Sequence, residues 1–291
     1  MSKLSPLPYR DVVFQTSAGA IHGRRWGKEG GQPVLALHGW LDNCATFDSL
    51  APLLSGVDLV AIDLLGHARS DFRRGDGPYN IWQDVHEIHA VISQLGWQQL
   101  ALLGHSRGAM QSFITAGSFP EKVTHLACLD ALWPMSVEPE KCPEQLAKAV
   151  LANKTELLDR KSRYDSFDAG VVARCHGVFR LAKNDAEILA KRGLIKVESS
   201  YYWRYDPCLL LPSEIMFTPR QIKAFLARIE VPILLLKASD GILQKKLDFL
   251  AELKQMGQIY DETIDGSHHF HLSQQAPAIA DRINRYFSTG H

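Results

Sequence analysis

The sequence predicts an α/β protein built on a mostly parallel sheet. Short apolar segments of strand length alternate with amphipathic segments of helical length along most of the chain. Several of the strand segments are apolar throughout, which is typical of strands that are buried on both faces. A chain of 291 residues is long enough for one large domain, or for one domain that carries an insertion.

Eight segments have the length and composition of strands. The first two are joined by a turn at residues 17–19, and several later ones end at glycine or at a polar residue. We therefore expect a sheet of eight strands, with helices on its flanks. The predicted strands are residues 11–16, 20–26, 33–37, 57–63, 100–103, 123–129, 231–236 and 258–263.

Four segments between or after these strands predict helices. In the first of them, Val85, Ile88 and Ile92 recur at helical spacing. Asn80 is a candidate N-cap for this helix and Gly96 a candidate C-terminal stop. The predicted helices are residues 81–95, 106–119, 243–256 and 278–287.

The alternation breaks between the sixth and seventh strands. Residues 133–219 are helical, charged and aromatic, without a convincing core strand. The predicted organisation is therefore a core domain of residues 1–132 and 217–291, interrupted by a helical cap at 133–216. A cap would cover the edge of the sheet where ligands bind. The alternative is a small second domain with a core of its own.

Composition and charge exclude several classes of protein. Apolar residues make up 46% and charged residues 22%, which excludes a disordered, collagen-like or coiled-coil chain. The 32 basic and 32 acidic residues balance, so we expect a small-molecule partner and not a nucleic acid. Five widely spaced cysteines, no secretory leader and no membrane-spanning run predict a cytoplasmic protein without disulfides, and no cofactor or metal is implied.

The strongest local motif is Gly104-His105-Ser106-Arg107-Gly108, a G-x-S-x-G pentapeptide. It follows an apolar strand and precedes a helix, the context in which a nucleophilic serine projects from a tight turn. The helix N-terminus also favours negative charge near Ser106. The alternative is a serine that only caps the helix after a glycine turn.

A serine nucleophile requires donors for the oxyanion of its tetrahedral intermediate. His38-Gly39-Trp40 follows the strand at residues 33–37, and the backbone N–H of Trp40 is one candidate donor. The backbone N–H of Arg107, directly after the nucleophile, is the other. Alternatively, His38-Gly39 is only a turn that ends a strand.

The predicted base is His268, because it follows the Gly-Ser turn after the last strand and precedes the closing helix. His269 and His271 are the alternatives. His105 lies on the strand side of the nucleophile, so we expect its ring to be buried and to point away.

Two aspartates could orient the base. Asp240 follows the strand at residues 231–236, and Asp130 follows the strand at 123–129. Loops after parallel strands meet at one edge of a sheet, so either can reach His268. The chain order Ser…Asp…His favours Asp240 as the acid and leaves Asp130 as the alternative.

The side chain of Arg107 is unusual in such a turn. A buried guanidinium requires hydrogen-bond acceptors or a counter-charge. We expect an ion pair with an acid at the same sheet edge, with Asp130 as the nearest candidate. The alternatives are exposure to solvent beside the cap and a contact with a substrate carboxylate.

These motifs together resemble the α/β-hydrolase fold serine hydrolases that carry a cap, and the resemblance covers essentially the whole chain. Within that superfamily the sequence is most similar to the serine hydrolase-like proteins, through residues 119–130. Relatives usually have glycine where Ala68 stands and often where Ser267 stands, and neither residue carries chemistry. The matching features are residues 38–40, residues 63–70, residues 104–108, Asp240 and His268.

The resemblance implies a serine hydrolase that cleaves a small carboxylic ester or a related acyl compound through an acyl-enzyme. Ser106 excludes the members of this fold that use an aspartate nucleophile. A carbon–carbon bond hydrolase, a cofactor-free haloperoxidase-like enzyme and a non-catalytic ligand receptor remain alternatives. Aromatic residues of the cap are candidates to line the pocket: Trp133, Phe167, Phe179, Tyr201, Tyr202 and Trp203.

Overall fold

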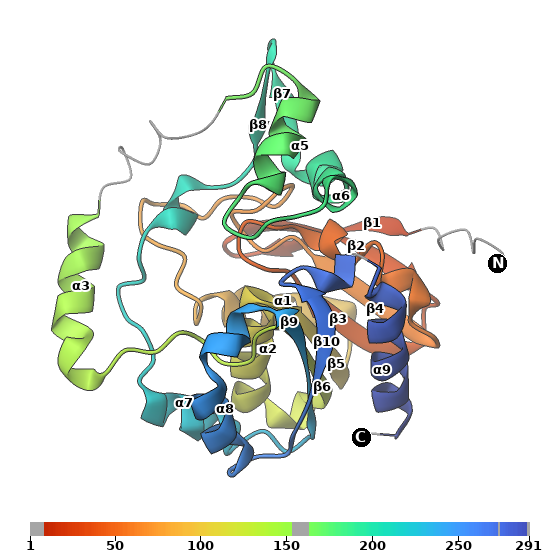
Figure 1. Cartoon of the computed structure of the whole chain (residues 1–291), viewed down its shortest axis with the longest axis vertical. Coiled ribbons are helices and arrows are strands. Elements are labelled where there is room, and N and C mark those ends of the chain that lie inside the picture. Colours follow the sequence, from red (N-terminus) through yellow and green to blue (C-terminus); the bar gives the residue numbers. More distant parts are fainter. Residues whose placement is uncertain (1–8, 153–162, 273, 290–291) are drawn as a thin grey trace.

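The computed structural model describes residues 9–152, 163–272 and 274–289. Its centre is an eight-stranded sheet in the order β1-β2-β4-β3-β5-β6-β9-β10 (Figure 1). The pairs β1–β2 and β2–β4 are antiparallel and the remaining pairs are parallel. All eight predicted strands are confirmed: β1 (Arg10–Thr16), β2 (Gly19–Gly27), β3 (Gln32–Leu37), β4 (Val57–Ile62), β5 (Leu100–His105), β6 (Val123–Leu129), β9 (Ile233–Asp240) and β10 (Ile259–Ser267).

The central strands are buried because both of their faces are covered. In β3, Leu35 and Leu37 belong to one hydrophobic cluster, whereas Val34 and Ala36 belong to a second cluster on the opposite face. Side chains of a strand alternate between faces, so an uninterrupted apolar run is what a sheet covered on both sides requires.

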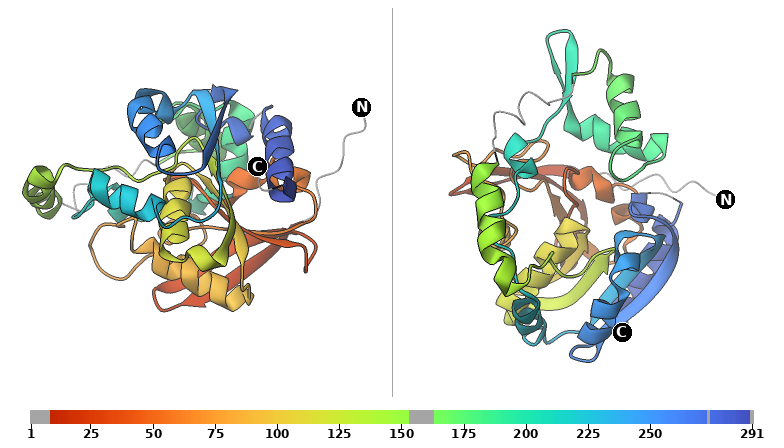
Figure 2. Two further views of the ribbon diagram at one scale, coloured as in Figure 1. Left: turned by 90° about the horizontal axis from the view of Figure 1, so that it is seen from below. Right: turned by 60° about the vertical axis from the view of Figure 1, so that its left-hand side comes forward.

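Helices supply the covering layers (Figure 2). Ile88 of α1 (Asp84–Leu95) and Phe113 of α2 (Arg107–Ser118) pack into the first cluster, together with residues of α7 (Pro219–Leu226) and α8 (Leu247–Lys254). Ile279 of α9 (Ala276–Thr289) packs into the second cluster. The four predicted helices are therefore present, and the sheet lies between two helical layers.

The start of α1 differs from the prediction. The helix begins at Asp84, and its N-cap is Gln83 without a capping side chain. Asn80 instead accepts a hydrogen bond from the backbone N–H of Glu214 at 3.3 Å, so it fastens a distant segment. Gly96 ends the helix in the left-handed region at φ 69°, as predicted.

The segment between β6 and α7, residues 133–216, is called here the inserted segment. It contains α3 (Cys142–Leu151), α5 (Phe167–Cys175) and α6 (Lys183–Gly193). It also contains a hairpin of β7 (Leu194–Val197) and β8 (Ser200–Trp203), separate from the main sheet. These strands are not among the predicted ones, because they are four residues long and only partly buried.

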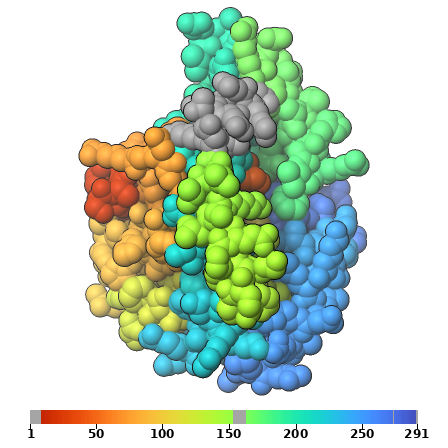
Figure 3. All heavy atoms as spheres, turned by 90° about the vertical axis from the view of Figure 1, so that its left-hand side faces the viewer, coloured from red at the N-terminus to blue at the C-terminus, as the bar shows by residue number. Residues whose placement is uncertain are grey.

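The two ends of the inserted segment differ in their packing. Val171 of α5 and Leu189 of α6 are fully buried in a third hydrophobic cluster, which also includes Leu272 after β10. By contrast, none of the ten residues of α3 is buried, and Val150 is 70% exposed. Figure 3 shows α3 on the outer face of the molecule. Among the described residues, no helix has the length and apolar character required to span a membrane.

Candidate active site

Ser106 lies in the tight turn between β5 and α2. Its backbone adopts φ 52° and ψ −118°, a conformation that is strained for a residue with a side chain. The turn closes because Gly108 has no side chain: a Cβ at this position would lie 1.9 Å from the carbonyl oxygen of Leu37. The sequence therefore holds the serine side chain out from the carboxyl edge of the sheet, as the G-x-S-x-G motif predicts.

His268 lies directly after β10 and is bound to a carboxylate. Its Nδ1 lies 2.6 Å from Oδ2 of Asp130, and both side chains are almost completely buried. Asp130 accepts two further hydrogen bonds, from the backbone N–H of Ala238 at 3.1 Å and of Ile242 at 2.9 Å. This carboxylate is held from three sides and fixes the orientation of the imidazole.

The expected contact between His268 and Asp240 is wrong. Asp240 is the last residue of β9 and is exposed, and these two described residues form no hydrogen bond with each other. The alternative acid, Asp130, occupies the position beside His268. The reason is the strand order: β6 lies directly beside β5, whereas β9 is one strand further from the nucleophile.

The loop between β3 and the first 3₁₀ turn, residues 38–43, is called here the oxyanion loop, after the role that the sequence analysis predicts for Trp40. A Cβ at Gly39 would lie 3.2 Å from the Cβ of Ser106, so this loop packs directly against Ser106. Trp40, Arg107 and Ser106 line one cavity of about 600 Å³. Within the described part of the chain, neither the Trp40 nor the Arg107 backbone N–H donates to another group. Both are available to a ligand.

The side chain of Arg107 makes an ion pair, but not with Asp130. Its Nη2 donates to Asp84 Oδ2 at 2.9 Å and to the carbonyl oxygen of Tyr79 at 2.8 Å. Asp84 also pairs with Arg73 at 2.9 Å, so the carboxylate joins two cations at the start of α1. The expected ion pair is therefore present with a different partner, because Asp130 is already engaged by His268.

Beneath Ser106 lies a group of buried histidines. His105 Nε2 donates to the backbone carbonyl of His268 at 3.0 Å, and Thr46 Oγ1 lies 2.8 Å from His271 Nε2. Burial holds the pKa of His105 and of His271 well below the ordinary value, so both rings are neutral at pH 7. These contacts confirm that His105 is buried and points away from the cavity.

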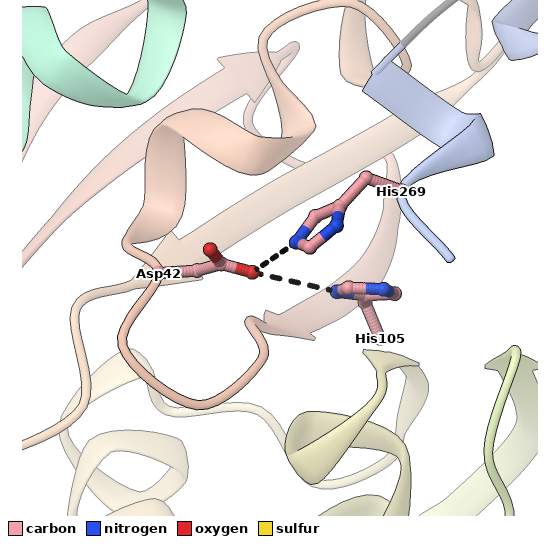
Figure 4. A group of neighbouring side chains, drawn as sticks. All are labelled: Asp42, His105 and His269. Atoms are coloured by element: carbon pink, nitrogen blue, oxygen red, sulfur yellow. Dashed lines mark hydrogen bonds and ion pairs between the residues drawn. The ribbon is translucent and has the colours of Figure 1, made fainter. Parts of the chain in front are cut away.

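Asp42 is the anion of this group (Figure 4). Burial opposes its ionisation, but His269 and Arg174 face the carboxylate and hold the pKa of Asp42 well below the ordinary value. Nε2 of His269 donates to Oδ2 at 2.9 Å, and Arg174 donates to Oδ1 at 2.6 Å. Asp42, His105 and His269 have the atom types of a metal site within 4.8 Å of one another. Because both carboxylate oxygens are already bound, the group is a hydrogen-bonded network.

Phe179 of the inserted segment packs against His268. Its ring centroid lies 4.2 Å from that of His268, and the residue also lines the cavity of Ser106. The other predicted aromatics do not line this cavity; Trp133, for example, packs against Phe249. Sequence reasoning missed most of the apolar lining, which includes Met110, Met135, Val137, Ile215, Met216 and Phe217.

Comparison with known proteins identifies the family of this chain. Residues 32–165 match the sequence model of the alpha/beta hydrolase fold. A human protein named serine hydrolase-like protein 2 is 30% identical over 294 residues, which cover 94% of this chain and 92% of that protein. A serine hydrolase-like protein of Dictyostelium discoideum is 27% identical over 92% of this chain and 78% of its own length.

Solved structures share the fold. A hypothetical protein from Pseudomonas aeruginosa superposes with a TM-score of 0.91 at 36% identity, covering 96% of this chain and 99% of that chain. A thioesterase domain from the curacin biosynthetic pathway gives a TM-score of 0.80 at 24% identity, over 95% of this chain and 99% of its own. The chain is a hydrolase that belongs to the alpha/beta hydrolase fold family, among the serine hydrolase-like proteins.

Proposed function

We propose that this hydrolase is an esterase that works through an acyl-enzyme formed on Ser106. His268 is the general base and Asp130 orients it, while the backbone N–H groups of Trp40 and Arg107 hold the oxyanion. The observation that carries the proposal is the 2.6 Å contact of His268 with buried Asp130, at the same sheet edge as a serine in a strained turn. A nucleophile, a base and an orienting carboxylate form the arrangement required for acyl transfer.

The reaction then follows from the groups present. Ser106 Oγ attacks the acyl carbon and gives its proton to His268 Nε2, while the Nδ1–H of His268 donates to Asp130. Negative charge develops on the former carbonyl oxygen, which accepts hydrogen bonds from the two backbone N–H groups. Collapse of the intermediate expels the leaving group, which takes the proton from His268. Water, activated by the same imidazole, hydrolyses the acyl-enzyme and restores Ser106.

The cavity supports an apolar acyl group as the substrate. Among the described residues, neither Asp nor Glu lines it, and its charged lining residues are Arg107 and Lys148. Arg107 is already paired with Asp84. Three of its apolar lining residues are methionines, whose flexible side chains adapt to acyl groups of different shape. We infer a carboxylic ester or thioester with an apolar acyl part.

We further propose that residues 133–216 act as the cap over this cavity and that the enzyme works in the cytoplasm. The contact of Phe179 with His268 supports the first inference, because a residue of the inserted segment then touches the catalytic base. The second inference is supported by Cys44, Cys128, Cys142 and Cys175, whose thiols form no disulfide in the described part of the chain, because a reducing compartment keeps thiols in this state.

Labelling with a fluorophosphonate tests the mechanism. The probe should modify Ser106, and Ser106→Ala should lose at least about 10³-fold in turnover of a nitrophenyl ester, because the triad acts as a unit. Labelling of another residue, or near-normal turnover by the variant, would exclude the acyl-enzyme. Esters and thioesters of graded acyl length then define the substrate class, with the same variant as the blank.

A further inference from the structure

The oxyanion loop is attached to the inserted segment at three points. Three of its side chains each make one polar contact with a different part of that segment, at distances between 2.6 and 3.0 Å. A loop held in this way takes its position from the inserted segment as well as from β3. The pairs are Trp40 Nε1 with the carbonyl oxygen of Leu209, Arg174 with Asp42 Oδ1, and Asn43 Nδ2 with the carbonyl oxygen of Leu189.

The loop needs such restraint because its backbone is strained. Leu41 has φ 59°, a left-handed conformation that a leucine rarely adopts. Asp42, the next residue, closes the turn with a hydrogen bond from its N–H to the carbonyl oxygen of Gly39 at 3.2 Å. The backbone N–H of Trp40, the proposed oxyanion donor, therefore lies inside a turn that would relax if the side chain of Asp42 were released.

Asp42 also reaches the two neighbours of the proposed catalytic residues. Its Oδ2 accepts from His269, which follows His268, and lies 3.8 Å from Nδ1 of His105, which precedes Ser106 (Figure 4). The Nε2 of His105 in turn donates to the backbone carbonyl of His268. One buried carboxylate thus joins the oxyanion loop, the nucleophile turn and the loop of the base.

We propose that Asp42 and Arg174 form a positioning pair, through which helix α5 of the inserted segment holds the oxyanion loop and the His268 loop in register. The inference rests on the proposed function, because it assigns a role to residues around that same site. Neither residue touches the reacting atoms; both act through the backbone donor at Trp40 and through the imidazole of His268.

The pair predicts opposite electrostatic effects for its two members. The charged or titratable groups that face His268 are Asp130, His105 and His269, and behind them lie His271, Asp42 and Arg174. Arg174→Met leaves the Asp42 anion uncompensated, which favours protonation of the histidines that surround it. Asp42→Asn leaves the Arg174 cation without its counter-charge, which disfavours protonation of the same histidines.

The test measures kcat, KM and the pH dependence of kcat/KM for Asp42→Asn, Arg174→Met and Arg174→Lys, with circular dichroism as the check of folding. We expect kcat to fall about 10-fold or more in the first two variants, with KM changed less than about threefold. The acidic limb should move to higher pH in Arg174→Met and to lower pH in Asp42→Asn, each by a few tenths of a unit. Arg174→Lys should restore part of kcat, because it keeps the charge.

The matched control is Arg192→Met. Arg192 of α6 pairs with Asp63 at 2.9 Å, so it joins the inserted segment to the core without contacting the His268 loop. This variant should lower the melting temperature and leave the pH dependence of kcat/KM unchanged.

Two results would overturn the proposal. One is a folded Arg174→Met variant with the kcat and the acidic limb of the wild type. The other is an Arg192→Met variant whose acidic limb moves as that of Arg174→Met does. Should Asp42→Asn not fold, Arg174→Met decides alone, since Arg174 lies partly at the surface. Failure of the proposed function would show separately, as turnover retained by Ser106→Ala.

Discussion

Strands β6 and β9 lie side by side and both lead to an aspartate at the same edge of the sheet, yet the two side chains have opposite environments. Asp130, after β6, is fully buried and binds His268 and two backbone N–H groups. Asp240, at the end of β9, is exposed. Both aspartates lie between Ser106 and His268 in the chain, so the order Ser…Asp…His does not separate them. The position of the strand in the sheet does, because β6 lies directly beside β5 and β9 does not.

The strongest test of the difference between Asp130 and Asp240 is to remove the charge of Asp130. Asp130→Asn should lower kcat about 10⁴-fold, because an amide cannot hold the imidazole in the tautomer that the base requires. Steady-state kinetics measure the loss, and near-UV circular dichroism checks that the variant is folded. If the folded Asp130→Asn variant keeps more than a tenth of the wild-type kcat, another acid orients the imidazole of His268.

A larger side chain next to Asp130 tests whether the position of its carboxylate matters for kcat. A Cβ at Gly241 would lie 2.1 Å from Oδ1 of Asp130, so Gly241→Ala should push the carboxylate away from His268. We expect kcat to fall about 10- to 100-fold, because a shift of about 1 Å costs up to 10² in rate. Gly77→Ala is the matched control, since a Cβ there meets open space. Equal kinetics in the two variants would contradict the prediction.

The buried histidines near this edge of the sheet predict that the fold is less stable in acid. Burial lowers the pKa of His67 to about 3, and burial likewise lowers the pKa of His105. In the unfolded chain both histidines titrate near pH 6.5, so the unfolded state binds more protons below that pH. The free energy of unfolding therefore keeps its full value above about pH 6.5 and decreases as the pH falls from there towards 3.

The melting temperature should accordingly fall by about 5 °C or more between pH 7 and pH 5. Differential scanning calorimetry measures it. Asp240→Asn should follow the same course as the wild type, because Asp240 is outside the buried group. A flat melting temperature over this range would mean that the histidines are charged in the folded state.

The smallest effect is expected at Asp240 itself. Asp240→Asn should change kcat/KM by less than about twofold and the free energy of unfolding by less than about 0.5 kcal/mol, the usual range for an exposed side chain. The same kinetic assay measures it beside Asp130→Asn. A loss of more than about 100-fold would reverse the comparison of the two strand ends.

The sequence predicts the fold well because the fold depends on local patterns. All eight strands, the glycine-flanked turn at Ser106 and the histidine after the last strand follow from apolar periodicity and from turn residues. The acid could not be predicted as well, because Asp130 and Asp240 both follow strands and only packing buries one of them. The partner of Arg107 was missed for the same reason, since Asp84 lies on a helix that the sequence does not bring to this edge.

The weakest predictions concern features that depend on contacts between distant segments. The cavity lining combines side chains of α2, of the segment after β6 and of the segment before α7, such as Met110, Met135 and Met216. These residues share no periodic signal along the chain. The Asp42 network likewise joins four separate parts of the sequence, and no local pattern marks it.

The φ of 52° at Ser106 has a consequence for how this protein can change over generations. A non-glycine residue in such a conformation costs about 1–3 kcal/mol of folding stability. Glycine adopts this conformation freely, so Ser106→Gly should have a higher free energy of unfolding than the wild type but no longer carry the proposed nucleophile. Selection for stability alone would favour this replacement. Proteins that keep serine at this turn are therefore less stable than they could be, and the function of the hydroxyl group is the reason that serine is retained.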